Sequence, residues 1–299
     1  MIGILLALCV AFLKSLGELA GKSFTDIQKS DSLDEYSLVF GARIFSIILL
    51  FPLVFFISFQ IPSNTSFVAL LISSSLNAVT NITAIKAVKY WDLSLVSPLS
   101  SLSIPFLLFT SYIITHEQVN IYGLIWVTII FIGTYFLGLE HLKTQWIFGP
   151  FKALMINRWA RYMFITAVLW SITSPFDKIG TLELWALNWM FYTNTLVSIF
   201  LGVYIFYFKK TIPLKKLLKT SHLKKISILT FVWWLWVFLQ LIALKYTLVV
   251  YVIALKRASG MFSVFLGWFF YKEKNIAQKC TAALIMLAWV WIISIFGNI

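Results

Sequence analysis

Long apolar stretches dominate this chain, and most of them have the length of a membrane-spanning helix. A helix needs about 20 apolar residues to cross the hydrocarbon layer of a bilayer. By that rule we predict ten spans, with no loop long enough to form a domain of its own. They are Ile2–Ala20, Tyr36–Phe59, Ser66–Val88, Leu93–Ile114, Ile121–Leu139, Arg161–Phe176, Leu182–Phe208, Ile226–Leu244, Leu248–Tyr271 and Ile276–Phe296. With 61% hydrophobic and only 12% charged residues, the sequence is that of a polytopic, all-α membrane protein.

The positive charges between these spans lie mainly in alternate loops. Of the 24 Lys and Arg residues, 18 fall in the loops that follow the odd-numbered spans or at the span ends beside them, whereas the opposite side carries only Lys178 and Lys245. Basic loops stay in the cytoplasm, so we expect both termini outside. We take the cell (cytoplasmic/inner) membrane as the location, with an organellar membrane as the alternative. The formal net charge of +13 is explained by these anchors, and we therefore expect no nucleic-acid partner.

The two halves of the sequence resemble each other. At an offset of 156 residues, the segment from Ala87 to Glu117 shows nine identities in 31 positions with the segment from Ala243 to Glu273. The same offset places Lys22 on Lys178. We therefore predict two five-helix repeats, residues 1–139 and 161–299, joined by a basic loop at residues 140–160. Five is an odd number, so the second repeat would be inverted in the membrane, as in many secondary transporters.

The repeated segments also resemble a known family. AVKYWDLSLVSPLSSLSIPFLLFTSYIITHEQ recurs as ALKYTLVVYVIALKRASGMFSVFLGWFFYKEK, and this pattern is similar to EamA-like members of the drug/metabolite transporter superfamily. The resemblance implies a ten-helix fold, a small-molecule substrate and no cofactor. Members of that family mostly keep both termini in the cytoplasm, so the charge pattern here predicts the opposite orientation.

Two adjacent cations, Lys256 and Arg257, stand near the middle of the predicted ninth span. A cation at the centre of a bilayer costs at least about 2.5–3.5 kcal/mol, so the pair should not face lipid. The pair stands where plastid phosphate translocators carry a similar Lys-Arg motif, and that resemblance implies a site for an anionic group. The alternative is a structural role, in which the cations pair with Glu18 or bind carbonyls of a broken helix.

Other polar residues lie deep in the predicted spans and should face the same cavity. Ser100 and Ser101 are the repeat partners of the Lys256-Arg257 pair. The other candidates are Lys14, Glu18, Arg43, Asn77 and Asn194. The deep cations outnumber Glu18 by three, which favours an anion over a cation as the substrate.

We therefore expect a secondary transporter or exporter of a small, possibly phosphorylated, anionic metabolite that works by alternating access as a monomer or homodimer. The alternatives are a transporter of neutral amino acids or lipid-linked sugars, and a membrane scaffold that transports nothing. Uncoupled efflux of an anion would need no ion partner, and Glu18 is the one embedded acid expected to be able to couple transport to protons. The sequence contains no metal-ligand cluster or catalytic motif, so we expect neither a metal nor an enzyme.

Overall fold

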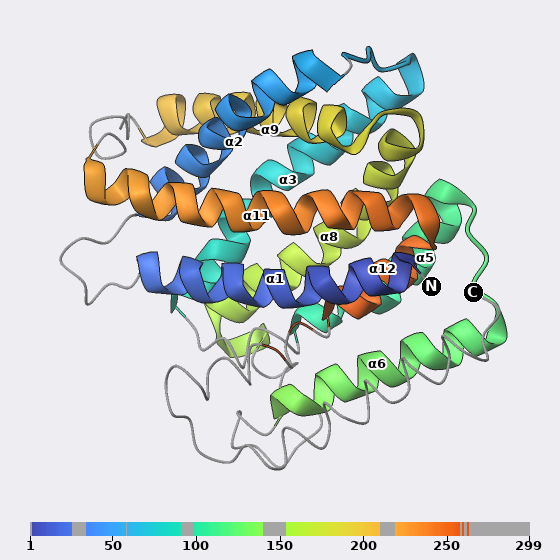
Figure 1. Ribbon diagram of the computed structural model, residues 1–299. Helices are drawn as coiled ribbons and strands as arrows, with labels where there is room; N and C mark the ends of the chain where they lie inside the picture. Colours follow the sequence, from blue (N-terminus) through green and yellow to red (C-terminus); the bar gives the residue numbers. More distant parts are fainter. Residues whose placement is uncertain are drawn as a thin grey trace.

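Helices account for the regular structure of this protein. The computed structural model describes residues 2–25, 34–57, 59–90, 99–139, 154–209 and 219–257, together with residues 259 and 262, and no strand occurs among them. The main helices are α1 (Ile2–Thr25), α2 (Glu35–Ile57), α3 (Asn64–Tyr90), α5 (Ser103–Thr115), α6 (Ile121–Leu139), α8 (Arg158–Glu183), α9 (Ala186–Tyr204), α11 (Thr220–Tyr246) and α12 (Val249–Arg257) (Figure 1). A π-helical turn, η2 (Ile205–Lys209), continues α9.

The helices follow the predicted spans closely, with one informative exception. Helix α6 has the predicted bounds Ile121–Leu139, whereas the predicted tenth span and much of the ninth lie outside the described residues. The sixth span was predicted to end at Phe176, but α8 continues to Glu183. Asp177 and Lys178 are therefore helical, and the expectation that Lys178 lies in a loop is wrong because both charges have partners inside the protein.

Side-chain caps set where several helices begin. The backbone N–H of Ser37 donates to Oδ1 of Asp34 at 2.9 Å, and that of Gly123 donates to Oδ1 of Asn120 at 2.6 Å. Each bond satisfies an N–H group that has no carbonyl partner in the first turn of its helix. These caps mark the starts of α2 and α6. Local hydrogen bonds therefore set where these two helices begin.

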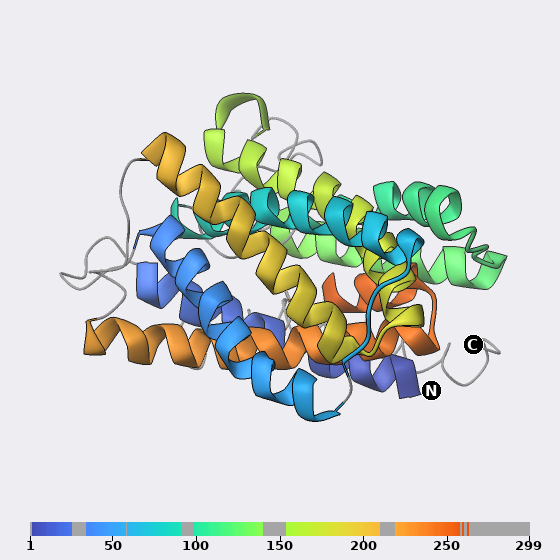
Figure 2. The same cartoon turned by 90° about the horizontal axis from the view of Figure 1, so that it is seen from above.

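Long helices from the two halves of the chain pack against each other. Helix α3 packs on α8, α1 on α11, and α2 on α9 (Figures 1 and 2). Helix α5 also packs on α8, and α12 packs on α1. Every one of these contacts joins residues 1–139 to residues beyond 157, so the packing between the halves forms the centre of the molecule.

The outer surface is apolar, as expected for a protein in lipid. Four of the described helices are long and apolar enough to cross a membrane, with further apolar helices that are shorter. Their bounds as spans are Glu35–Phe56, Asn64–Ala87, Ala186–Phe208 and Ser221–Tyr246. Large side chains such as Phe56 and Phe208 are 89% and 75% exposed, which suits contact with hydrocarbon rather than water. The protein is a multi-pass membrane protein.

Candidate functional site

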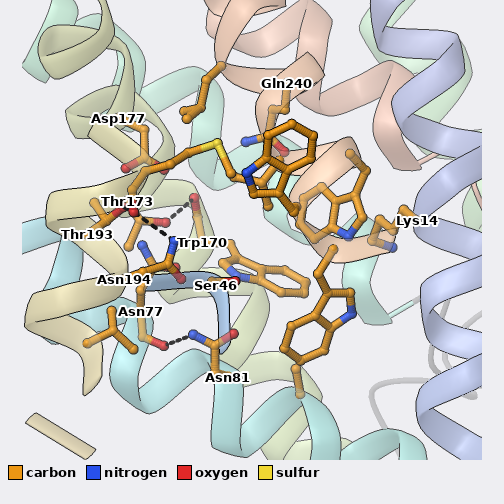
Figure 3. Close-up of a pocket in the computed structure, with 18 of the residues that line it drawn as sticks. Lys14, Ser46, Asn77, Asn81, Trp170, Thr173, Asp177, Thr193, Asn194 and Gln240 are labelled. Atoms are coloured by element: carbon orange, nitrogen blue, oxygen red, sulfur yellow. Dashed lines mark hydrogen bonds between the residues drawn. The ribbon is translucent and has the colours of Figure 1, made fainter. Parts of the chain in front are cut away.

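A polar cavity lies where the two halves meet. Its volume is about 150 Å³, and its walls come from α1, α2, α3, α8, α9, α11 and α12 (Figure 3). Its charged and amide side chains are Lys14, Arg43, Asn77, Asn81, Asp177, Asn194, Gln240 and Lys256. Seven helices contribute to one cavity, so a ligand there would touch both halves at once.

Lys256 reaches the cavity, whereas Arg257 turns away from it. The Lys256 Nζ donates to Oε1 of Gln240 at 2.7 Å and lies 4.5 Å from the centre of the Trp236 ring. The Arg257 Nε donates to Oγ of Ser103 at 2.9 Å, and Arg257 is absent from the residues that line the cavity. Successive helix positions point about 100° apart, which separates the two neighbours.

Arg43 is held by amide groups at the cavity wall. Its Nη1 donates to Oδ1 of Asn194 at 2.6 Å and its Nη2 to Oδ1 of Asn81 at 2.8 Å. Its guanidinium also lies 5.9 Å from the centre of the Trp233 ring. Amide oxygens and an aromatic face orient the guanidinium at the cavity wall.

Lys14 brings a third cation to the cavity from α1. It is only 6% exposed, and its Nζ donates to Oγ of Ser259 at 3.0 Å. The acceptor of this hydrogen bond is a neutral hydroxyl. Three cations, Lys14, Arg43 and Lys256, thus line one cavity.

Asp177 is a cavity residue that the sequence analysis missed. Its Oδ1 accepts hydrogen bonds from Oγ of Ser73 at 2.6 Å and from Nε1 of Trp189 at 3.1 Å. It is the only carboxylate among the described residues that line the cavity. Helical spacing contains the missed signal: Trp170, Thr173 and Asp177 lie on one face of α8, and all three line the cavity (Figure 3).

Two local features position Asp177 on α8. Pro175 has no N–H, which frees the carbonyl of Ser171 from its helical bond, and the hydroxyl of Thr110 donates to that carbonyl at 2.6 Å. One turn further on, a Cβ at Gly180 would lie 2.0 Å from the Trp189 ring. The missing side chain therefore lets Trp189 lie against α8 and donate to Asp177.

The predicted site residues divide into three groups in the structure. Those that line the cavity are Lys14, Arg43, Asn77, Asn194 and Lys256. Those that are buried but do not line it are Ser100, Ser101 and Arg257. Glu18 belongs to α1, and its side chain lies outside the described residues.

The cavity combines excess positive charge with an aromatic lining. Of the described residues that form its walls, three are cations and one is a carboxylate. Five are tryptophans: Trp170, Trp189, Trp233, Trp234 and Trp236. Such a cavity suits an anion that has a planar or apolar body, because indole faces can pack on the body while the cations hold its charge.

A buried ion pair closes the bundle beside this site. Oε1 of Glu117 accepts from Nζ of Lys178 at 2.5 Å, and its Oε2 accepts from the backbone N–H of Val249 at 2.9 Å. Lys178 also donates to the carbonyl of Thr247 at 2.9 Å. Because Lys178 follows Asp177 directly, one turn of α8 carries both a cavity residue and the ion pair that joins α8 to the start of α12.

The described residues contain no group of three His, Cys, Asp or Glu side chains that could hold a metal ion. The carboxylate, ammonium, guanidinium and amide groups of the cavity can donate hydrogen bonds to a small molecule and accept hydrogen bonds from it.

Comparisons with known proteins agree with this arrangement. Residues 1–139 match the EamA-like transporter family. A crystal structure described only as that of a protein aligns with 97% of this chain and 98% of its own, at 12% sequence identity and a TM-score of 0.69, which supports the fold alone. No curated protein matches the sequence. The resemblance seen in the sequence is confirmed over residues 1–139, which match the EamA-like transporter family, a family of the drug/metabolite transporter superfamily.

Proposed function

We propose that this protein is a secondary transporter of a small organic anion. The observation that carries the proposal is the charge of the cavity, where Lys14, Arg43 and Lys256 outnumber the one described carboxylate, Asp177. Buried cations are costly in a membrane and mark substrate pathways in many transporters. A substrate carboxylate or phosphate would balance this excess of positive charge.

The proposed anion site uses two of the cations that line the cavity, Lys256 and Arg43. Lys256 exchanges Gln240 for the substrate, and Arg43 offers its guanidinium from a frame of Asn81 and Asn194. A charge-assisted hydrogen bond is about twice as strong as a neutral one, so the exchange favours binding. Arg257 supports the site from behind through Trp170, whose ring centre lies 5.0 Å from the guanidinium.

The proposed mechanism is alternating access by two inverted five-helix repeats, residues 1–139 and 161–299. The packing of the helices supports it, since an offset of 156 residues maps α1 onto α8, α2 onto α9 and α3 onto α11. The contact of α3 with α8 is then equivalent to that of α11 with α1, and α2 with α9 is equivalent to itself. The cavity would lie on the pseudo-twofold axis between the repeats, where such transporters bind their substrates.

The orientation that we propose has the basic loops in the cytoplasm. Glu117 lies between α5 and α6, Thr247 lies between α11 and α12, and Glu183 ends α8. In this orientation all three lie on the side opposite to the basic loops, so the ion pair of Glu117 with Lys178 would face the exterior. In this structure the pair is formed, which supports a state that is closed toward the outside.

A second substrate class is favoured by one observation. Asp177 shares the cavity with Arg43 and Lys256, so a zwitterion such as a neutral amino acid would place its ammonium on Asp177 and its carboxylate on the cations. The excess of positive charge makes the anion our first choice. A membrane scaffold that transports nothing would need neither the excess of cations nor the carboxylate in the cavity.

A thermal-stability screen of the purified protein in detergent tests the proposal. Size-matched anionic, neutral, zwitterionic and cationic metabolites are compared on wild type and on the Lys256→Gln variant. A ligand at 100 times its Kd adds about 2.7 kcal/mol to the free energy of unfolding, which raises the melting temperature. We expect anions alone to stabilise wild type and the variant to lose the response. Stabilisation by zwitterions alone would support the second class, and no stabilisation by any class would contradict both.

A further inference from the structure

Asp177 is a carboxylate in a cavity that we assign to an anion. Its Oδ1 accepts hydrogen bonds from Ser73 and Trp189, and no described residue donates to its Oδ2. The side chain lies at the cavity wall near Thr173, one turn of α8 before it (Figure 3). One carboxylate oxygen is therefore available to carry a proton.

Hydrogen bonds connect this carboxylate to the cation across the cavity. Ser73, Asn77 and Asn81 lie four residues apart on one face of α3. The Asn77 Nδ2 donates to Oγ of Ser73 at 3.1 Å, the Asn81 Nδ2 donates to the carbonyl of Asn77 at 2.5 Å, and Arg43 donates to Asn81. A polar line thus runs along α3 from Asp177 to Arg43.

The charged groups that act on Asp177 from neighbouring helices are cations. Lys256 of α12 and Arg43 of α2 both attract it electrostatically. The groups that reach it from α3 and α9 are the neutral Ser73 and Trp189. The cations near the far end of α3 have partners there: Lys86 donates to the hydroxyl of Tyr36, and Lys89 pairs with Glu35.

We propose that Asp177 is a proton-binding site linked to anion binding, so that a substrate anion and one proton enter the cavity together. This proposal rests on the proposed function. An unbound cavity uses the carboxylate as the counter-ion of Arg43 and Lys256. An arriving anion takes over those cations and repels the carboxylate, which then takes up a proton on Oδ2. By thermodynamic reciprocity, protonation of Asp177 strengthens anion binding by the same factor.

The affinity for the anion should fall as the pH rises. At low pH Asp177 is protonated before the anion arrives, and affinity is at its maximum. As the pH rises, binding must include the uptake of a proton, and affinity falls until the carboxylate stays ionised even beside the anion. A monovalent anion carried together with one proton moves no net charge, unlike the uncoupled efflux expected from the sequence.

The test measures binding with probes whose own charge does not change. Indole-3-carboxylate and sulfate keep their charge between about pH 5.5 and pH 8.5, and their affinities are measured in detergent by titration calorimetry. For wild type we expect at least about a fivefold loss of affinity over that range. Asp177→Asn, which mimics the protonated residue, should bind with high affinity at both pH values.

A matched control separates this effect from general acid sensitivity. Glu117→Gln removes a buried carboxylate that does not line the cavity, and it should keep the pH dependence of wild type. If Asp177→Asn does not fold, Ser73→Ala provides the second measurement. It removes a hydrogen bond to the ionised carboxylate, so the midpoint of the pH dependence should move to higher pH.

The outcomes are distinct. Wild-type affinity that does not change with pH, or an Asp177→Asn variant with the same pH dependence as wild type, would overturn the proton-linked site and leave anion binding intact. If neither probe binds either protein at any pH, the proposed anion site itself is overturned. Loss of affinity in Asp177→Asn at every pH would show that the carboxylate binds the ligand directly, and it would also overturn the proposal.

Discussion

The ion pair of Glu117 and Lys178 offers the sharpest test of how the two halves hold together. Their side chains are 7% and 12% exposed, so the pair is shielded from water. Glu117 also accepts the N–H of Val249, the first residue of α12. Replacing Glu117 by Gln keeps the shape and an acceptor for Val249, but it leaves Lys178 without its counter-charge.

These contacts set how much stability the Glu117 variants should lose. Removing one partner of a fully buried pair costs about 3–5 kcal/mol. Lys178 keeps a second acceptor in the carbonyl of Thr247, which offsets part of the loss. We therefore expect Glu117→Gln to lower the free energy of unfolding by about 2–4 kcal/mol. Glu117→Ala should cost about 1 kcal/mol more, because it also removes the cap of α12.

The assay is a double-mutant cycle by reversible unfolding in detergent micelles. Glu117→Gln, Lys178→Met and the double variant are compared with wild type. Because the residues are in direct contact, the double variant should be more stable than the sum of the single effects predicts, by about 0.5–3 kcal/mol. Additive single effects below about 0.5 kcal/mol each would refute the reasoning, since they would mean that the pair is not formed in the folded protein.

Two other predictions concern helix α8. Gly180→Ala places a Cβ against the Trp189 ring, so we expect a loss of about 1–3 kcal/mol of stability and a shift in tryptophan fluorescence; unchanged values would contradict the close packing. The exposed Glu183 accepts hydrogen bonds from the side chains of Ser63 and Ser66 and from the backbone of Ser63, which hold the pKa of its carboxyl below its ordinary value. A lowered pKa in the folded state gives stability that is present above the unfolded pKa of about 4.3 and is lost as the pH falls through the folded value. Glu183→Gln should therefore make the melting temperature less sensitive to acid. A melting temperature with the same pH dependence as wild type would argue against the hydrogen bonds of Glu183 with Ser63 and Ser66.

Span length and loop charge predicted most of the helix positions, because the bilayer fixes the length of an apolar helix. The same reasoning failed at the end of α8. Asp177 and Lys178 were interpreted as the start of a loop, since adjacent charges usually mark water. In the structure they have partners elsewhere in the protein. The helical spacing of Trp170, Thr173 and Asp177 indicates one shared face of α8, but it does not show which residues those partners are.

The depth of a polar residue in a predicted span did not show whether its side chain points into the cavity. Lys256 and Arg257 are equally deep, yet only Lys256 lines the cavity. Ser100 and Ser101 correspond to them in the repeat and are buried in helix packing instead. Which face of a helix meets the cavity depends on how the helices pack, and without an alignment of relatives the sequence does not fix that rotation.

The most direct measurement is the uptake of organic anions into proteoliposomes that contain the purified protein. Wild type is compared with Lys256→Gln, which alters the cavity, and with Arg257→Gln, which alters a buried residue behind it. The account predicts uptake faster than in empty vesicles for at least one anion, and a loss of that uptake in Lys256→Gln under conditions where the variant remains folded. Arg257→Gln should lose stability but keep transport in its folded fraction. Uptake by Lys256→Gln at the wild-type rate, or no anion uptake by wild type, would contradict the central claim.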